Sequence, residues 1–275
     1  MDFYSSPSVY SVYFKPALLA ENEKYILKIA ETEDEFSQVF RLRTQSFQHF
    51  DDSAGEIDRD EYDDKAMIII ALRRSDNVVC GTYRFMNHPR NRWEDMYSRE
   101  HFDLSSLPQG ILPISFEIGR TCVADTDVKE NSAIISLFWK GIGAMLHRGR
   151  WRYLFGSVSV FNPEPARVWA IADYFEQNGY TDKEMGMCSA NVAVPRPSDA
   201  EMTAYLAKYP NIKRTIPPLL RSYITIGSKI VSEPEYCAQL GCANFLVCLD
   251  MAKLPSEVAK RFSPNGVLPP HLSEL

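Results

Sequence analysis

The stretch FEIGRTCVAD, from Phe116 to Asp125, places two charged side chains, Glu117 and Arg120, in an otherwise apolar strand pattern. Side chains alternate between the two faces of a strand, so Glu117 shares a face with Ser115 and Gly119, while Arg120 is expected on the opposite face. A carboxylate on the inner face of an apolar strand is costly in free energy unless it is hydrogen-bonded or used in chemistry. Glu117 is therefore either a structural carboxylate bonded to the backbone or a functional one.

The sequence on either side of this strand alternates between strand and helix patterns. Downstream, Ser132 is the expected cap of a helix that ends near Gly149, and a second helix is expected to begin at Pro163. Upstream, the triplet SDN at 75–77 is typical of a hairpin loop. The expected strands are 25–30, 66–74, 78–85, 113–123, 153–160 and 243–254, and the expected helices are 32–40, 132–148, 163–179, 199–208 and 216–230.

This order of elements indicates an α/β domain in which the two strands around the central helix are parallel. The sequence has no linker that would separate two independent domains. We expect one domain over residues 1–275, with a core at about 25–180 and with 181–275 completing the same sheet.

Composition describes an ordinary globular chain with a local basic patch. The 275 residues are 45% hydrophobic, and 36 acidic residues exceed 30 basic ones, which argues against a nucleic-acid partner. The segment HRGRWR contains Arg148, Arg150 and Arg152 at the end of the central helix pattern. These arginines are either a docking site for an anionic partner or solvated charges at a helix end.

The chain shows no pattern of a metal site, a disulfide framework or a membrane span. Six cysteines are scattered without a CxxC pair, so we expect reduced core thiols. The five histidines are not closely spaced, and the acidic segment FDDSAGEIDRDEYDD has Phe50 where a calcium loop needs its first ligand. No targeting segment or run of 18 apolar residues is visible, so a cytoplasmic location is expected.

Several motifs of known chemistry are missing, while a set of ordered motifs is present. GxGxxG, GxxxxGK[ST], GxSxG and HExxH do not occur. The motifs that do occur, in order, are RLRTQSF (41–47), DEYDD (60–64), GTYRF (81–85), FEIGRTCV (116–123), LFWKGIGAML (137–146), YLFGSVS (153–159), IPPLLRSYITIGSKI (216–230) and FLVCLDM (245–251).

Together these motifs closely resemble the ornithine-lipid acyltransferases, the L-ornithine N-alpha-acyltransferases that also carry the label hemolysin. That family is part of the GNAT superfamily of N-acyltransferases, and a fainter similarity extends to the acyl-homoserine-lactone synthases. The resemblance covers about residues 25–262. It implies a mixed central sheet splayed between two parallel strands, here 114–123 and 153–160, flanked by helices and followed by a C-terminal extension.

The resemblance also implies a reaction and a set of site residues. A fatty acyl chain, expected to be a 3-hydroxyacyl chain, would move from a carrier-protein thioester to the α-amine of an amino acid such as ornithine. Glu117 would act as general base, with Arg120, Asp60 and Asp63 as further catalytic residues. The residues implied for substrate binding are Arg43, Phe47, Arg84, Thr121, Cys122, Val123, Ser157 and Ser159.

The donor and the acceptor are less constrained than the reaction. Superfamily members that hold coenzyme A wrap its pyrophosphate with a glycine-rich loop, and this chain has VKENSA at 128–133 instead. We therefore expect an acyl carrier protein as donor, docked on Arg148, Arg150 and Arg152, with acyl-coenzyme A as the other candidate and no tightly bound cofactor. A different acceptor amine, peripheral membrane contact at the inner membrane, and a non-catalytic lipid-associated protein on the same fold remain as alternatives.

Overall fold

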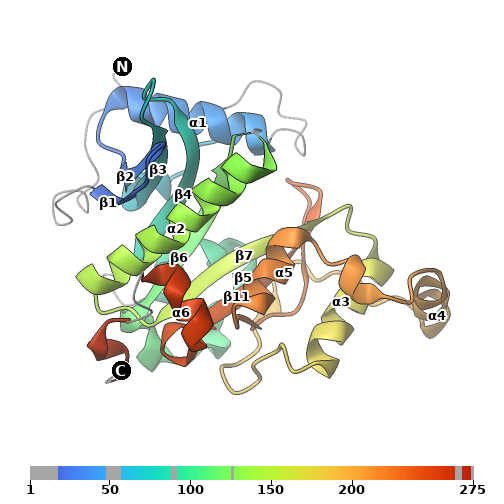
Figure 1. Ribbon diagram of the computed structural model, residues 1–275. Helices are drawn as coiled ribbons and strands as arrows, with labels where there is room; N and C mark the ends of the chain where they lie inside the picture. Colours follow the sequence, from blue (N-terminus) through green and yellow to red (C-terminus); the bar gives the residue numbers. More distant parts are fainter. Residues whose placement is uncertain (1–17, 48–56, 88–91, 125–126, 264–267, 274–275) are drawn as a thin grey trace. The chain divides into compact units, whose positions relative to one another are not determined.

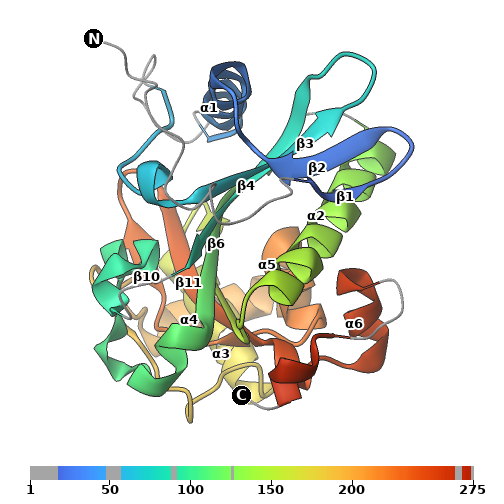
Figure 2. The same cartoon turned by 90° about the vertical axis from the view of Figure 1, so that its left-hand side faces the viewer.

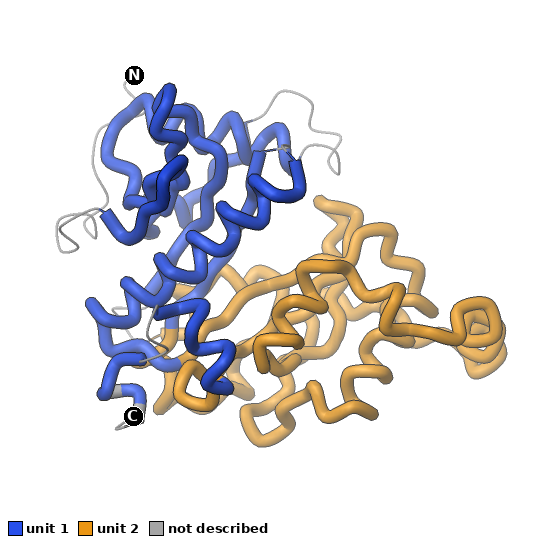
Figure 3. The backbone as a smooth tube through the Cα atoms, in the orientation of Figure 1, with its two compact units in different colours: residues 1–87, 116–152, 255–275 blue, residues 88–115, 153–254 orange. Residues whose placement is uncertain are grey.

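The computed structural model describes residues 18–47, 57–87, 92–124, 127–263 and 268–273. Contacts within the chain group it into two compact units, shown in two colours in Figure 3. Unit 1 comprises residues 1–87, 116–152 and 255–275, and unit 2 comprises residues 88–115 and 153–254.

Unit 1 is built on antiparallel strands in the order β1-β2-β3-β4-β6 (Figure 1). Strands β3 and β4 are buried along nearly their whole length, which indicates that both faces of the sheet are covered. The strands are β1 (Leu18–Glu21), β2 (Tyr25–Ile29), β3 (Met67–Arg73), β4 (Val79–Asn87) and β6 (Ser115–Val123).

Helices α1 (Glu33–Phe47) and α2 (Val128–Arg148) cover opposite faces of this sheet (Figures 1 and 2). On one face the ring of Tyr83 packs edge-on against Phe138 of α2, with 5.0 Å between ring centroids. On the other face Arg84, the next residue of β4, shares the Asp63 carboxylate with Arg43 of α1. The alternation of β4 thus sends Tyr83 toward α2 and Arg84 toward α1.

Helix α1 begins as expected from the sequence, but α2 begins earlier. Thr32 Oγ1 accepts the Glu35 N–H and Glu35 Oε2 accepts the Thr32 N–H, which is a reciprocal capping arrangement. The expectation that Ser132 caps α2 was wrong, because Asp127 Oδ1 accepts the N–H groups of Lys129 and Glu130. Ser132 lies inside the first turns and donates its hydroxyl to the Val128 carbonyl instead.

Helix α6 (Ser256–Phe262) packs on α2 at Gly143. A Cβ added to Gly143 would lie 1.8 Å from the Phe262 carbonyl oxygen, so this helix contact requires glycine. We expect Gly143→Ala to separate α6 from α2 and to lower the free energy of unfolding by about 1–3 kcal/mol, measured by denaturant unfolding. Gly110→Ala is the matched control, because a Cβ there meets nothing within 4 Å. Equal stability of the two variants would contradict the packing argument.

Unit 2 is organised around the antiparallel pair β7 (Tyr153–Phe161) and β11 (Cys242–Asp250), which match over nine residue pairs. Strand β11 also pairs with β9 (Lys229–Ile230) and β10 (Glu235–Cys237), while β5 (Phe102–Asp103) pairs with β8 (Ser189–Ala190). Its helices are α3 (Pro165–Gln177), α4 (Asp199–Lys208) and α5 (Pro218–Thr225). A buried apolar cluster that includes Trp93, Phe155 and Leu246 forms its core.

The α/β class expected from the sequence is confirmed, and so is the 199–208 helix, residue for residue. The splay between 114–123 and 153–160 stays a prediction, because the two segments fall in different units, and so does the single-domain organisation. All six cysteines are buried and free of disulfides. Among the described residues, every helix is too short or too polar to cross a lipid bilayer.

Candidate functional site

Six charged side chains of unit 1 form a connected set of ion pairs, called the charged cluster here. The sequence places them far apart, at the end of α1, in the segment before β3, on β4 and on β6. The cluster consists of Arg43, Asp58, Asp60, Asp63, Arg84 and Arg120.

The inner part of the charged cluster is an ion triad of Arg43, Asp63 and Arg84. Asp63 Oδ1 lies 2.7 Å from Arg43 Nη1 and 3.4 Å from Arg84 Nη1, and all three side chains are at most 2% exposed. Asp63 Oδ2 accepts the Asp60 backbone N–H at 3.0 Å. Burial alone would raise the pKa of Asp63, but the Arg43 and Arg84 guanidiniums outweigh burial and lower it. Asp63 is therefore a fixed anion that joins α1, β4 and the acidic segment.

The outer part of the charged cluster is more open to solvent. Asp60 bridges the two parts, since its Oδ1 lies 2.5 Å from Arg84 Nη1 and its Oδ2 lies 3.3 Å from Arg120 Nη2. Arg120 Nε also lies 3.2 Å from Asp58 Oδ1. The side chains of Asp58, Asp60 and Arg120 are 17%, 25% and 19% exposed, so a polar ligand can reach them.

Asp58 was not among the residues predicted from the sequence. Burial raises its pKa, although the Arg120 and Arg43 guanidiniums oppose the shift. Its backbone N–H donates to Thr44 Oγ1 at 2.9 Å, which fixes the acidic segment on α1. The available signal was the spacing of Asp58 and Asp60, which places two carboxylates on one side of an extended segment.

A β-bulge brings Arg120 into the charged cluster. On β4 and β6, Arg84 lies opposite Gly119 and Thr82 lies opposite Cys122, so two residues of β6 oppose Tyr83 alone. Arg120 is the first of these two, and its φ of +49° is in the left-handed region that side chains other than glycine rarely adopt. The expectation that Arg120 lies on the face opposite Glu117 was therefore wrong, because strict alternation stops at the bulge.

Glu117 lies on the same face of the sheet as Arg84. Directly opposed residues share a face, and Glu117 is opposite Met86 while Gly119 is opposite Arg84. Glu117 is 2% exposed, and the pleat places it about 7 Å along β6 from Gly119. The structure thus brings Glu117 to the face that carries the charged cluster.

Aromatic rings cover the guanidiniums of the charged cluster. Arg120 lies 6.0 Å from the ring centroid of Phe47, and Arg84 lies 5.6 Å from that of Tyr62. Such rings stabilise a cation and limit the water around it. Phe47 was predicted as a substrate-binding residue, and it contacts the site through Arg120.

Residues 121–123 complete the end of β6. Cys122 and Val123 lie opposite Thr82 and Gly81 of β4. Burial raises the pKa of the Cys122 thiol to about 11, although a hydrogen bond with Ser46 partly opposes this shift. The thiol is therefore protonated at neutral pH and is not a nucleophile.

Ser157 and Ser159 belong to unit 2 and lie on β7, so the structure does not place them relative to the charged cluster. Ser159 Oγ donates to Asn244 Oδ1 at 2.7 Å, and Ser157 Oγ lies 3.5 Å from Ser98 Oγ. Their predicted role toward substrate stays a prediction.

The three arginines predicted to dock a carrier protein differ in exposure. Arg150 is exposed, whereas Arg148 and Arg152 are half-buried. Arg148 Nη2 donates to the Leu18 carbonyl at 2.7 Å, and burial lowers its pKa. Arg148 therefore also anchors the first strand, and Arg150 is the member best placed for an outside partner.

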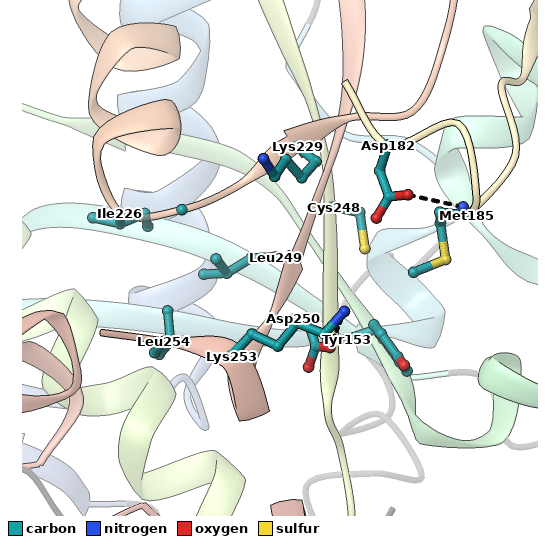
Figure 4. Close-up of a pocket in the computed structure, with 11 residues that line it drawn as sticks. Tyr153, Asp182, Met185, Ile226, Lys229, Cys248, Leu249, Asp250, Lys253 and Leu254 are labelled. Carbon is teal, nitrogen blue, oxygen red and sulfur yellow. Dashed lines mark hydrogen bonds and ion pairs between the residues drawn. The ribbon is translucent and has the colours of Figure 1, made fainter. Parts of the chain in front are cut away.

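Unit 2 has a pocket of about 200 Å³ between β7, β11 and the segment after α3 (Figure 4). Cys248, Met185 and Tyr153 are among its lining residues. Asp182 Oδ1 accepts the Met185 N–H, and Lys229 Nζ donates to the Gly179 carbonyl, so these charged groups are bonded to backbone. None of the residues predicted for the site is among the eleven that line it.

Residues 37–140 match the family model described as an acetyltransferase (GNAT) domain. This range is less than half of the chain, and it contains all six members of the charged cluster together with Glu117. The match identifies an enzyme of the N-acyltransferase class, which confirms the class expected from the sequence.

The chain is similar to several solved structures, of which three are described here. FeeM, an N-acyl amino acid synthase from uncultured soil microbes, is 9% identical over 85% of this chain and 95% of its own, with a TM-score of 0.46. The acyl-homoserine-lactone synthase LasI is 9% identical over 90% of this chain and 99% of its own, with a TM-score of 0.45. BjaI, a coenzyme A-dependent acyl-homoserine lactone synthase, is 12% identical over 86% and 84%, with a TM-score of 0.44.

At these identities and TM-scores the three structures assign no activity to this chain. A search of curated proteins finds no match.

Proposed function

We propose that this N-acyltransferase moves a fatty acyl chain, such as a 3-hydroxyacyl chain, from an acyl carrier protein thioester to the α-amine of an amino acid such as ornithine. The observation that carries the proposal is the outer part of the charged cluster. Asp58, Asp60 and Arg120 present two carboxylates and one guanidinium that are partly exposed and held by ion pairs. A diamino acid has the complementary set of two amines and one carboxylate.

The two parts of the charged cluster have different duties in this proposal. Arg120 binds the carboxylate of the acceptor, and Asp58 and Asp60 bind its two amino groups. The buried triad of Arg43, Asp63 and Arg84 positions the outer groups, since it is closed to solvent. Asp63 is therefore a positioning residue rather than a group that touches substrate.

The chemistry is aminolysis of a thioester. The neutral α-amine attacks the thioester carbonyl, the C–N bond forms, the C–S bond breaks, and the pantetheine leaves as a thiolate, which then takes up the proton that the amine has lost. Glu117 takes this proton first, directly or through a water, and is regenerated when the thiolate is protonated. The backbone N–H groups of residues 121–123 stabilise the oxyanion that forms on the carbonyl.

The N-terminus of α2 supports a carrier protein as the donor. A pyrophosphate at a helix N-terminus needs free N–H groups and a positive potential. Here the Asp127 carboxylate already accepts the N–H groups of Lys129 and Glu130 at 2.8 and 2.9 Å, and Glu130 adds a second negative charge. A carrier protein brings only one phosphate and binds largely through protein contacts. It therefore depends less on free N–H groups and positive potential at the N-terminus of α2.

The role of Arg120 can be tested with an acceptor that lacks the carboxylate. 1,4-Diaminobutane is ornithine without its carboxylate, so Arg120 has nothing to bind in it. We expect Arg120→Met to raise the KM for ornithine about 10- to 100-fold, because the loss of one hydrogen bond to a charged group weakens binding by about this factor. The rate with 1,4-diaminobutane should stay unchanged. Arg59→Met is the control, because Arg59 pairs with Asp64 outside the cluster. If Arg120→Met loses the same activity with both acceptors, Arg120 has a structural role and does not bind the acceptor carboxylate.

The donor can be tested at Arg150, the exposed member of the basic patch. Carrier proteins are acidic, so Arg150→Glu should lower kcat/KM for acyl carrier protein about 10-fold at low salt and less at high salt, because like charges then repel. The reaction with acyl-coenzyme A should change less. Arg221→Glu, an exposed position on α5, is the matched charge reversal. If both variants lose the same activity with both donors, the patch is not the docking site.

A further inference from the structure

Cys237 and Cys242 face one another across the hairpin formed by β10 and β11 in unit 2. Their Cα atoms are direct partners in the antiparallel register, and their thiols are hydrogen-bonded to each other. Directly opposed residues of an antiparallel pair have Cα atoms about 4.5 or 5.5 Å apart. Both values lie in the range of about 4.4–6.8 Å that a disulfide requires, so the two sulfurs can bond without a change of the strands.

We infer that Cys237 and Cys242 are a redox modification site, at which a peroxide converts the two thiols into an intramolecular disulfide. In the first step the Cys237 sulfur attacks hydrogen peroxide, becomes a sulfenic acid, and water leaves. In the second step the Cys242 sulfur attacks the sulfenic acid, the S–S bond forms, and a second water leaves. Two thiols and one peroxide thus give one disulfide and two waters, and an added dithiol reverses the change.

The surroundings of the pair select Cys237 as the thiol that reacts first. The hydrogen bond from Cys242 lowers the pKa of Cys237, and the Leu240 N–H and the nearby His101 lower it further. Burial and the Glu235 carboxylate raise this pKa, but they do not outweigh the lowering. Burial raises the pKa of Cys80, Cys122, Cys188 and Cys248, and the hydrogen bond with Cys237 raises that of Cys242. Cys237 therefore has the greatest thiolate character among the six.

The position of the pair at the end of the hairpin gives a small oxidant access. Cys237 and Cys242 are the last matched residues of β10 and β11, and the turn between them contains the exposed residues Ala238, Gln239 and Gly241. Cys237 is itself 7% exposed, whereas Cys242 is 0% exposed. The resolving thiol is thus protected from oxidation by a second peroxide.

Oxidation also changes one contact of the neighbouring polar network. The single thiol hydrogen of Cys242 is shared between Cys237 Sγ and Asn244 Oδ1, which lies 3.6 Å from Cys242 Sγ. Asn244 also accepts from Ser159 and donates to Glu235. A disulfide has no hydrogen to donate, so this contact is lost. The inference concerns the thiols alone and stands independently of the proposed acyl transfer.

The test is peptide mapping of the full-length protein after treatment with a small excess of hydrogen peroxide. Chymotrypsin cleaves after Leu240, between the two cysteines, so the peptides that contain Cys237 and Cys242 stay joined only if the disulfide forms. We expect the joined pair, with a loss of two hydrogen atoms, and its release by a dithiol. The other four cysteines, modified with iodoacetamide after unfolding, should remain thiols at the same peroxide dose.

Two variants make the assignment specific. Cys242→Ser should leave a sulfenic acid at Cys237 that dimedone captures, and Cys237→Ser should leave Cys242 unmodified at the same dose. Circular dichroism verifies that both variants are folded, and the wild-type peptide map decides the question if either is not. Peroxide that leaves both thiols free for alkylation in the wild-type protein, or that joins Cys237 to another cysteine, would overturn the inference.

Discussion

Glu117→Gln is expected to lower the rate of acyl transfer by about 10² to 10⁴-fold at neutral pH while leaving the protein folded. Glutamine keeps the volume of the side chain and can still form hydrogen bonds, but it cannot accept the amine proton. Part of the activity should return at high pH, because more of the acceptor amine is then already deprotonated. Initial rates measured across pH with a saturating donor check both statements.

The matched control for this variant is Asp58→Asn. Asp58 is the alternative candidate for the base, because burial raises its pKa and the side chain is 17% exposed. Our assignment expects Asp58→Asn to raise the KM for the acceptor more than it lowers kcat. If Glu117→Gln retains activity within a few-fold of the parent and Asp58→Asn loses kcat, the base is Asp58 and Glu117 is structural.

Asp63→Asn is expected to lower the free energy of unfolding by about 3–5 kcal/mol at pH 7, because it leaves the buried Arg43 and Arg84 guanidiniums without their central anion. The folded-state pKa of Asp63 is lowered, so its stabilising contribution is fully present above the ordinary pKa of about 4 and is lost as the pH falls through the lowered value. The difference between variant and parent should therefore shrink in acid. Denaturant unfolding at several pH values measures it.

Asp58→Asn again serves as the control, because the pKa of Asp58 is shifted in the opposite direction to that of Asp63. Burial raises the folded-state pKa of Asp58, so folding favours the protonated form, and this stability is lost as the pH rises through the raised value. An asparagine carries no charge to desolvate, and Arg120 keeps Asp60 as a partner. Asp58→Asn should consequently be as stable as the parent at pH 7, or more so. A large loss in Asp58→Asn together with a small one in Asp63→Asn would contradict the division of the charged cluster into two parts.

The parts of the fold that could be predicted from the sequence are those fixed by local patterns. The helix α4 was predicted residue for residue, because Ser198 and Glu201 form a capping box that marks its start. The start of α2 was missed, because two side chains, Asp127 and Ser132, could each cap a helix and only the packing decides between them. Strand β1 was also missed, since its four residues alternate weakly and depend on pairing with β2.

The charged cluster was only partly accessible from the sequence. The resemblance selected Arg43, Asp60, Asp63, Arg84 and Arg120, and the structure brings these five together through ion pairs. The side of the sheet on which Arg120 lies depends on a single inserted residue in the β4–β6 pairing, which no periodic pattern reveals. Asp58 was missed because its pKa shift and its contact with Arg120 arise only after the acidic segment folds onto α1.

The central claim, transfer of an acyl group from a thioester to an amino acid, is tested most directly with the purified protein. Acyl carrier protein loaded with a 3-hydroxyacyl chain is incubated with ornithine, and the products are followed by mass spectrometry. Parallel reactions contain the same chain on coenzyme A, and the other amino acids as acceptors. We predict an N-acylated ornithine from the carrier-protein donor, at a rate that Glu117→Gln lowers by about 10²-fold or more. An intact thioester in every reaction, with no N-acyl amino acid from either donor, would contradict the account.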